Sequence, residues 1–157
     1  MSKNLVDICV NLTDEVFSGN EDSIIDEANQ KNITKMVLVG NDLKSSKKCQ
    51  ILAQKYNFFS TAGYHPHNAK EWDENSYTEL QKLIKFENVR AVGECGLDFN
   101  RNFSSPEIQH EVFEKHIDLA KETGLPLFVH ERDAFHQMHK ILSENVKDRK
   151  KVVVHCF

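Results

Sequence analysis

The chain repeats one pattern along its length: a short apolar run, a turn, and then a longer amphipathic stretch. Six apolar runs are expected to be strands: Leu5–Leu12, Lys35–Gly40, Phe58–Tyr64, Val89–Cys95, Pro126–His130 and Lys151–His155. Five amphipathic stretches between them are expected to be helices: Asp22–Lys31, Lys44–Lys55, Asn75–Phe86, Pro106–Glu122 and Ala134–Asn145. Strands that alternate with helices in this way form βαβ units, so we predict an α/β protein with a parallel sheet covered by helices.

The helix expected at Pro106–Glu122 has the clearest end signals. Ser105 is a suitable N-cap, Pro106 fits the first helical turn, and Gly124 is expected to end the helix. The connections between expected elements are short except at Leu97–Ser105 and Pro66–Glu74. Longer loops in a domain of short connections often carry function, so these two segments are expected to contribute to substrate selection.

Carboxylates and imidazoles recur where the expected strands end. Ligands bind at the carboxyl ends of the strands in parallel α/β folds, because the loops that follow the strands gather there. Glu94 closes one apolar run between Gly93 and Gly96, and a buried ionised group requires a cation, a substrate or another partner. We expect the two glycines to leave room for that partner to approach. The other candidates at strand ends are Asp98, His65 with His67, His130, Arg132 and His155.

This combination of side chains suits a divalent-metal hydrolase. Imidazole nitrogen and carboxylate oxygen bind zinc, manganese and magnesium, and a bound metal activates water and polarises a phosphoryl or carbonyl oxygen. A structural role is the alternative for each: a salt bridge for Glu94, a satisfied core position for His130 and His155, and a rigid loop corner for His65 and His67. Some residues are expected to serve only surface or packing roles: His110, His116, His136, His139, Cys95 and Cys156.

Composition narrows the class of protein. With 157 residues the chain has the length of one domain, and 20 Lys plus Arg against 24 Asp plus Glu give a formal net charge of -4. This balance argues against a broad basic surface for nucleic acid, but not against an enzyme that binds a few phosphates with the help of a metal. No apolar run approaches the ~20 residues of a membrane span, and the N-terminus lacks a signal-peptide profile. We therefore expect a cytoplasmic protein without membrane association and with reduced cysteines; the sequence carries no signal for an oligomeric state.

Five segments together resemble the TatD family of metal-dependent deoxyribonucleases, in the family's order along the chain. They are Asp7–Thr13, Thr61–His67, Gly93–Phe103, Phe128–Asp133 and Val154–Phe157. The resemblance implies a (β/α)₈ barrel of the amidohydrolase type that binds divalent metals at its C-terminal face. It also implies hydrolysis of DNA phosphodiester bonds, as a 3′→5′ exonuclease on single-stranded DNA.

Carried over position by position, the resemblance implies a role for each of the strand-end residues. Glu94, His130 and His155 would be metal ligands, with Mg²⁺ or Mn²⁺ favoured and Zn²⁺ as the alternative. His65 would lie on the phosphate side and, with Glu94, take part in catalysis. Arg132 and Asp98 would contact the substrate.

The chain departs from the wider family pattern in two places. Many relatives carry two histidines on the first strand, where this chain has Cys9 and Asn11. A (β/α)₈ barrel takes about 250 residues, so we expect residues 1–157 to form a single TatD-like domain with about six of the eight βα units, truncated before the family's later Thr-Asp-x-Pro segment. Two other interpretations stay open: an amidohydrolase-like enzyme acting on small esters or amides, and a catalytically inactive truncated product.

Overall fold

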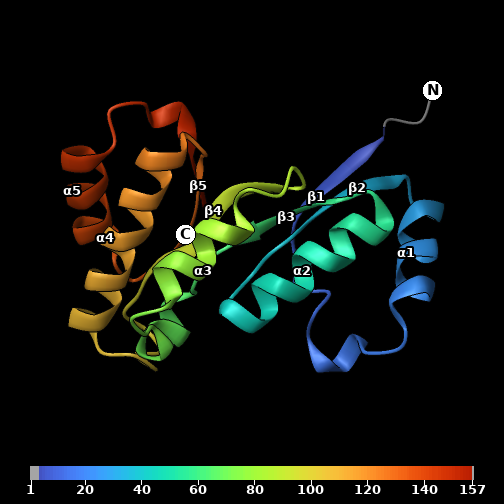
Figure 1. Ribbon diagram of the computed structural model, residues 1–157, viewed down its shortest axis with the longest axis horizontal. Coiled ribbons are helices and arrows are strands. Elements are labelled where there is room, and N and C mark those ends of the chain that lie inside the picture. The colour runs from blue at the N-terminus through green and yellow to red at the C-terminus, as the bar shows by residue number, and fades with distance from the viewer. Residues whose placement is uncertain (1–3, 157) are drawn as a thin grey trace.

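Six parallel strands lie in one sheet in the order β1-β2-β3-β4-β5-β6 in the computed structural model, which describes residues 4–156 (Figure 1). The strands are β1 (Leu5–Val10), β2 (Ile33–Leu38), β3 (Phe59–Ala62), β4 (Val89–Asp98), β5 (Leu127–Arg132) and β6 (Val152–His155). The helices that follow them are α1 (Glu21–Gln30), α2 (Leu43–Tyr56), α3 (Ser76–Leu83), α4 (Pro106–Thr123) and α5 (Phe135–Asn145). Three short 3₁₀ helices complete the described elements: η1 (Glu15–Phe17), η2 (Pro66–Glu71) and η3 (Arg149–Lys151).

The predicted alternation of strands and helices is confirmed, with shifts at the element ends. β4 extends beyond the predicted Cys95 to Asp98, because its last residues pair with β5 as far as Arg132. The expected loop Pro66–Glu74 begins with helix η2, which His65 caps by accepting the backbone N–H of His67. Both changes bring predicted site residues into regular, paired backbone.

Helix α4 begins and ends where the sequence predicts. The Ser105 side chain accepts the backbone N–H of Ile108, Pro106 stands in the first turn, and Gly124 ends the helix with a φ of +71°. In the part of the chain that the structure describes, none of the helices has the length and apolarity needed to cross a membrane.

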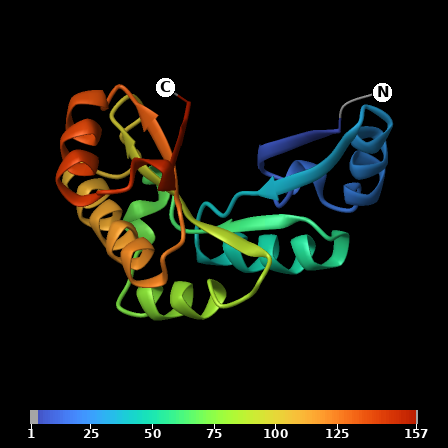
Figure 2. The ribbon, with the colours of Figure 1, turned by 90° about the horizontal axis from the view of Figure 1, so that it is seen from above.

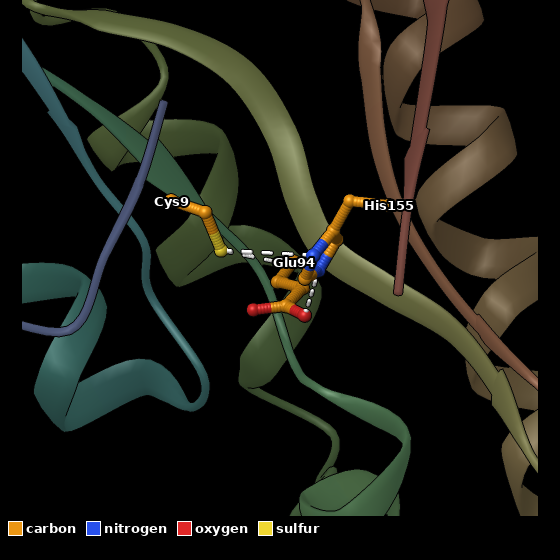
Figure 3. A group of neighbouring side chains, drawn as sticks. All are labelled: Cys9, Glu94 and His155. Carbon is orange, nitrogen blue, oxygen red and sulfur yellow. Dashed lines mark hydrogen bonds and ion pairs between the residues drawn. The ribbon is translucent and has the colours of Figure 1, made fainter. Parts of the chain in front are cut away.

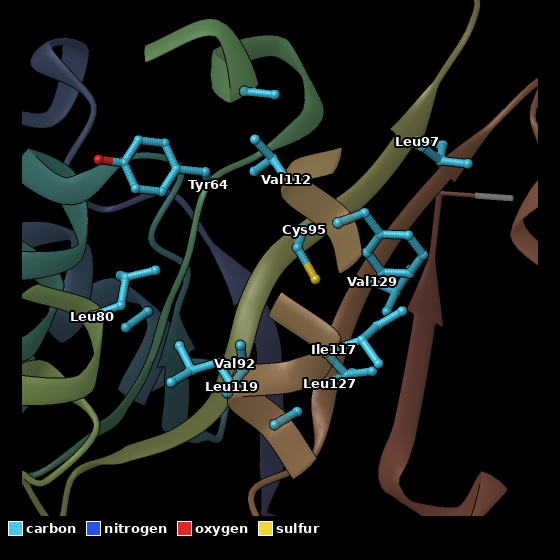
Figure 4. Packing of buried hydrophobic residues seen from close by; sticks show 14 of the residues in the cluster. Tyr64, Leu80, Val92, Cys95, Leu97, Val112, Ile117, Leu119, Leu127 and Val129 are labelled. Carbon is cyan, nitrogen blue, oxygen red and sulfur yellow. The ribbon is translucent and has the colours of Figure 1, made fainter. Parts of the chain in front are cut away.

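The helices cover the outer side of a curved sheet, which Figure 2 shows from above. The larger apolar core lies between β3–β5 and helices α3–α5, with Leu97, Ile117 and Leu119 among its fully buried members (Figure 4). A smaller core around Leu38 and Cys49 lies beneath helices α1 and α2. The packing holds the carboxyl ends of neighbouring strands at one edge, where the candidate residues are.

The outermost strands of the described sheet are β1 and β6. On β1, the side chains of Leu5, Val6 and Ile8 are largely exposed, although a strand with neighbours on both sides would bury such residues. Six parallel strands in consecutive order, with five α-helices between them, correspond to an incomplete (β/α)₈ barrel, as the sequence predicts.

Candidate metal centre

A polar cavity of about 340 Å³ opens at the carboxyl ends of the strands. Its lining comes from β1, β4, β5 and β6 and from the segments after β1, β2 and β3: Cys9, Asn11, Asn41, His65, His67, Asn68, Glu94, His130 and His155. The structure thus brings together four of the predicted site residues: Glu94, His65, His130 and His155. Residues far apart in the sequence meet here because parallel strands place their carboxyl ends on the same side.

Glu94 lies at the centre of the cluster. Its Oε1 is 2.5 Å from Nε2 of His155, 3.2 Å from Nδ1 of His130 and 3.6 Å from Nε2 of His65. Burial by itself would raise the pKa of Glu94, but the hydrogen bonds with His130 and His155 outweigh burial and lower the pKa to about 2. The carboxylate is therefore ionised, and three imidazole rings surround it.

The backbone around Glu94 explains how a strand residue reaches the cavity. The pairing of β4 with β5 shifts register between Gly93 and Cys95, so Glu94 sits at an irregularity of the kind that re-aims a side chain. Its backbone N–H donates to the carbonyl oxygen of Gly40 at 3.0 Å. This hydrogen bond ties the backbone of Glu94 to the segment that follows β2.

Gly93 and Gly96 do not have the role near Glu94 that the sequence predicts. A Cβ on Gly93 would collide with the carbonyl oxygen of Phe128, and one on Gly96 with that of His130. Both glycines have φ near +130°. They allow the backbones of β4 and β5 to approach each other, so the expectation that they leave room for a ligand is wrong.

Asp98 lies behind two of the histidines and not in the cavity wall. Its Oδ2 is 2.7 Å from Nε2 of His67 and 3.2 Å from Nε2 of His130, while its Oδ1 accepts the backbone N–H of Arg101. Burial would raise the pKa of Asp98, but these bonds, led by that from Arg101, lower the pKa to about 2. Because the side chain is fully buried, its position suits the orientation of His130 better than the predicted contact with substrate.

His65 is neutral and has one defined tautomer. Burial lowers its pKa to about 3, against the opposing effect of Glu94. Its Nδ1 accepts the backbone N–H of His67 at 3.1 Å, so the proton of the ring is on Nε2, which faces Glu94. The ring therefore presents an N–H donor to the cavity.

His155 lies between Glu94 and a side chain that the sequence did not assign to the site. The Cys9 Sγ is 3.8 Å from Nδ1 and 4.0 Å from Nε2 of His155 (Figure 3). The hydrogen bonds with Cys9 and with Glu94 raise the pKa of His155 to about 10. The sequence offered one signal for Cys9, its place on the first strand where many relatives of the family have a histidine.

The remaining predictions have mixed outcomes. Arg132 ends β5 half-buried and is not among the residues of the described chain that line the cavity, so its role as a phosphate contact stays a prediction. Cys95 is fully buried, as predicted, whereas Cys156 is exposed and the prediction that it fills an apolar space is wrong. His116 has the predicted packing role: it is fully buried and accepts the backbone N–H of Tyr64.

The donor atoms fit a divalent cation. Two sets of three have ligand atoms within 4.8 Å of one another, His65 with Glu94 and His130, and Cys9 with Glu94 and His155. Histidines that bind metals commonly donate their second ring N–H to a carboxylate, and Asp98 stands in that place beside His130. The cluster thus has both the ligands and the outer support of a metal site.

A parallel barrel-type sheet with a histidine and carboxylate cluster at its carboxyl edge defines a class of metal-dependent hydrolases. Residues 6–157 match the family model described as TatD related DNase, and the chain belongs to this family. Membership implies a divalent metal, for which the cluster supplies ligands.

The relatives and solved structures agree with this assignment. The chain is 41% identical over 155 residues to a 3′-5′ ssDNA/RNA exonuclease TatD of Edwardsiella piscicida and 37% identical to that of Dickeya dadantii, covering 98% of this chain in each case. It also matches the TatD homologue YJJV of Escherichia coli, with a TM-score of 0.87 at 26% identity, over 97% of this chain and 60% of that one. A TatD family hydrolase of Entamoeba histolytica gives a TM-score of 0.90 at 29% identity, over 100% of this chain and 59% of that one. The chain spans 60% and 59% of the lengths of the two curated relatives.

Proposed function

We propose that this chain carries the metal-binding site of a nuclease that removes nucleotides from the 3′ end of single-stranded DNA by hydrolysis. The observation that carries the proposal is the buried Glu94 carboxylate with three imidazoles around its Oε1. The names of the relatives, 3′-5′ ssDNA/RNA exonuclease TatD, support the substrate class and add RNA to it.

Glu94, His130 and His155 are the proposed metal ligands. The family resemblance favours Mg²⁺ or Mn²⁺. Of these two ions the imidazoles suit Mn²⁺ better, because Mg²⁺ prefers oxygen ligands. A divalent ion held there would lower the pKa of bound water and polarise the phosphoryl oxygen. Asp98 would fix the ring of His130 from behind, in place of the substrate contact expected from the sequence.

His65 is the proposed phosphate-binding residue. Its Nε2–H faces the cavity, and a neutral N–H donor suits a non-bridging phosphate oxygen. Metal binding through Nε2 would require this proton to move to Nδ1, but Nδ1 already accepts the backbone N–H of His67. His65 would therefore position the substrate while the other two histidines hold the ion.

Phe103 is the proposed contact for a nucleobase. Phe103 is 54% exposed, and its ring lies edge-on to the ring of His67, with centroids 4.8 Å apart. His67 lines the cavity, so Phe103 stands beside its entrance. An exposed aromatic ring next to a phosphate-binding site is a stacking surface for the base of a single strand.

A labelled single-stranded oligonucleotide tests the proposal. With Mn²⁺, we expect stepwise shortening from the 3′ end that a 3′ block prevents, alongside the Edwardsiella piscicida relative as the positive control. Glu94→Gln should abolish both shortening and Mn²⁺ binding, whereas Glu107→Gln, which changes an exposed carboxylate on α4, should abolish neither. Digestion that survives in Glu94→Gln would overturn the proposal, and so would a wild-type chain that binds no Mn²⁺.

A further inference from the structure

Cys9 differs from the other buried or half-buried thiols of the chain in what surrounds it. The Cys49 thiol donates to the carbonyl oxygen of Val39 at 3.2 Å, and the Cys95 thiol contacts the carbonyl oxygen of Phe128 at 3.6 Å. Burial raises the pKa of Cys49 to about 12 and the pKa of Cys95 well above its usual value. These two thiols are packing groups, whereas Cys9 lines the polar cavity.

The sulfur of Cys9 points at two of the groups that surround the proposed ion. Figure 3 shows Cys9 and His155 extending toward each other from β1 and β6, with the Glu94 carboxylate next to the His155 ring. The Sγ, the Glu94 oxygen and the His155 nitrogen all lie within 4.8 Å of one another. In the described chain, the ring nitrogens of His155 are the polar side-chain atoms that the Cys9 Sγ contacts.

The distances suit a shared metal ion. Zn–S and Zn–N bonds of about 2.3 and 2.0 Å sum to roughly 4.3 Å, the largest separation at which one ion can bond both atoms. The Sγ lies 3.8 Å from Nδ1 and 4.0 Å from Nε2 of His155, inside that limit for either nitrogen. A tetrahedral ion would separate such a pair by about 3.6 Å, so little movement is required.

We propose that Cys9 is a thiolate ligand, which together with Glu94 and His155 makes the centre a mixed sulfur, oxygen and nitrogen site that selects Zn²⁺ or Co²⁺ over Mg²⁺. The inference rests on the proposed metal site but not on nuclease activity. Thiolate is a soft ligand that Mg²⁺ does not favour, and imidazole and carboxylate complete a set typical of zinc. Binding forms one metal–sulfur bond, and the thiol proton leaves to solvent.

Cobalt provides the test, because Co²⁺ bound to a thiolate shows a sulfur-to-metal charge-transfer band in the near ultraviolet. Titration of the purified 157-residue chain with CoCl₂ should give this band in the wild type. Cys9→Ser should lose the band and bind Co²⁺ and Zn²⁺ at least about tenfold more weakly, since even the loss of an outer partner of a ligand costs about 10–100-fold. Mg²⁺ binding should change much less. Cys156→Ser, which removes an exposed thiol next to His155, should keep the band.

A second measurement requires no variant. Alkylation followed by peptide mass spectrometry should show that Zn²⁺ protects Cys9, while Cys156 in the same molecule stays reactive. Equal reactivity of Cys9 with and without Zn²⁺ would overturn the proposal. Loss of the charge-transfer band in Cys156→Ser would overturn it as well. If the chain binds Co²⁺ without the band, and Glu94→Gln abolishes that binding, the metal site exists but Cys9 is not one of its ligands, and the proposal is overturned. A chain that binds no cobalt would overturn both.

Discussion

Asp98 and Glu94 hold the two ring nitrogens of His130 from opposite sides, each at 3.2 Å. One carboxylate lines the cavity and the other is buried behind the ring. The ring is therefore fixed before any ion arrives, and its Nδ1 is the nitrogen that faces the proposed ligand Glu94. Preorganisation of this kind is what a metal site requires of its outer residues.

The role of Asp98 predicts a loss of metal affinity without a loss of fold. Asp98→Asn keeps an oxygen for the backbone N–H groups of Asn100 and Arg101 but removes the charge behind His130. We expect Mn²⁺ affinity, measured by calorimetry, to fall about 10–100-fold. Asp133→Asn changes an exposed carboxylate that accepts from the same loop and should leave the affinity unchanged. Equal affinities for both variants would contradict the role.

The buried, neutral state of His116 predicts how the stability of the fold depends on pH. Burial lowers its pKa to about 4, from 6.5, and its Nε2 accepts the Tyr64 N–H only while that nitrogen is unprotonated. The folded pKa is depressed, so neutral His116 stabilises the fold fully above pH 6.5, and this contribution is lost as pH falls toward 4. The loss amounts to about 3 kcal/mol in the free energy of unfolding.

Urea unfolding at a series of pH values measures this dependence. His116→Gln, which does not titrate, should flatten the slope of unfolding free energy between pH 6.5 and 4. His110→Gln changes a histidine whose side chain is 44% exposed and should keep the wild-type slope. A wild-type slope in His116→Gln would refute the assignment.

The close packing at Gly63 is expected to affect both the stability of the fold and metal binding by Glu94. A Cβ at this position would lie 2.5 Å from the Cα of Gly93, the residue before Glu94. We expect Gly63→Ala to cost about 1–3 kcal/mol in urea unfolding and also to weaken Mn²⁺ binding, because the displaced backbone carries Glu94. Gly124→Ala has open space but a φ of +71°, so it should lower stability and leave Mn²⁺ binding intact. A Gly63→Ala protein with wild-type affinity would show that the two strands tolerate the displacement.

Removal of the Phe103 ring is expected to weaken the binding of single-stranded oligonucleotides. Stacking of one base on an aromatic ring contributes about 1–3 kcal/mol, so Phe103→Ala should weaken oligonucleotide binding about 5–150-fold by fluorescence anisotropy. Phe135→Ala removes an exposed ring on α5, away from the cavity lining, and should have no effect. Similar losses in both variants would indicate a nonspecific surface effect and not a stacking site.

The sequence predicts the order and type of the strands and helices because each element carries its own periodicity and end signals. Ser105 and Gly124 bound α4 through local hydrogen bonds and backbone conformation, which depend on few neighbours. Glu94, His130 and His155 could be placed at one edge because parallel strands align their carboxyl ends.

Contacts across the sheet could not be predicted in the same way. Whether Asp98 faces the cavity or the space behind His130 depends on the register of β4 against β5, which shifts beside Glu94. The function of Gly93 and Gly96 depends on how closely two backbones approach. The contact between Cys9 and His155 joins residues 146 positions apart, and neither residue's neighbours in sequence indicate it.

Cys9 and His155 stand on the outermost strands of the described sheet, with four strands between them, whereas Glu94 and His130 stand on adjacent strands. A small change in twist at each strand pair accumulates before it reaches the outer pair but hardly alters the inner one. The distance between the Cys9 thiol and the His155 imidazole therefore depends on the curvature of the whole sheet. An ion bonded to both would fix that curvature, and slower amide exchange along β1 and β6 would be the sign of it.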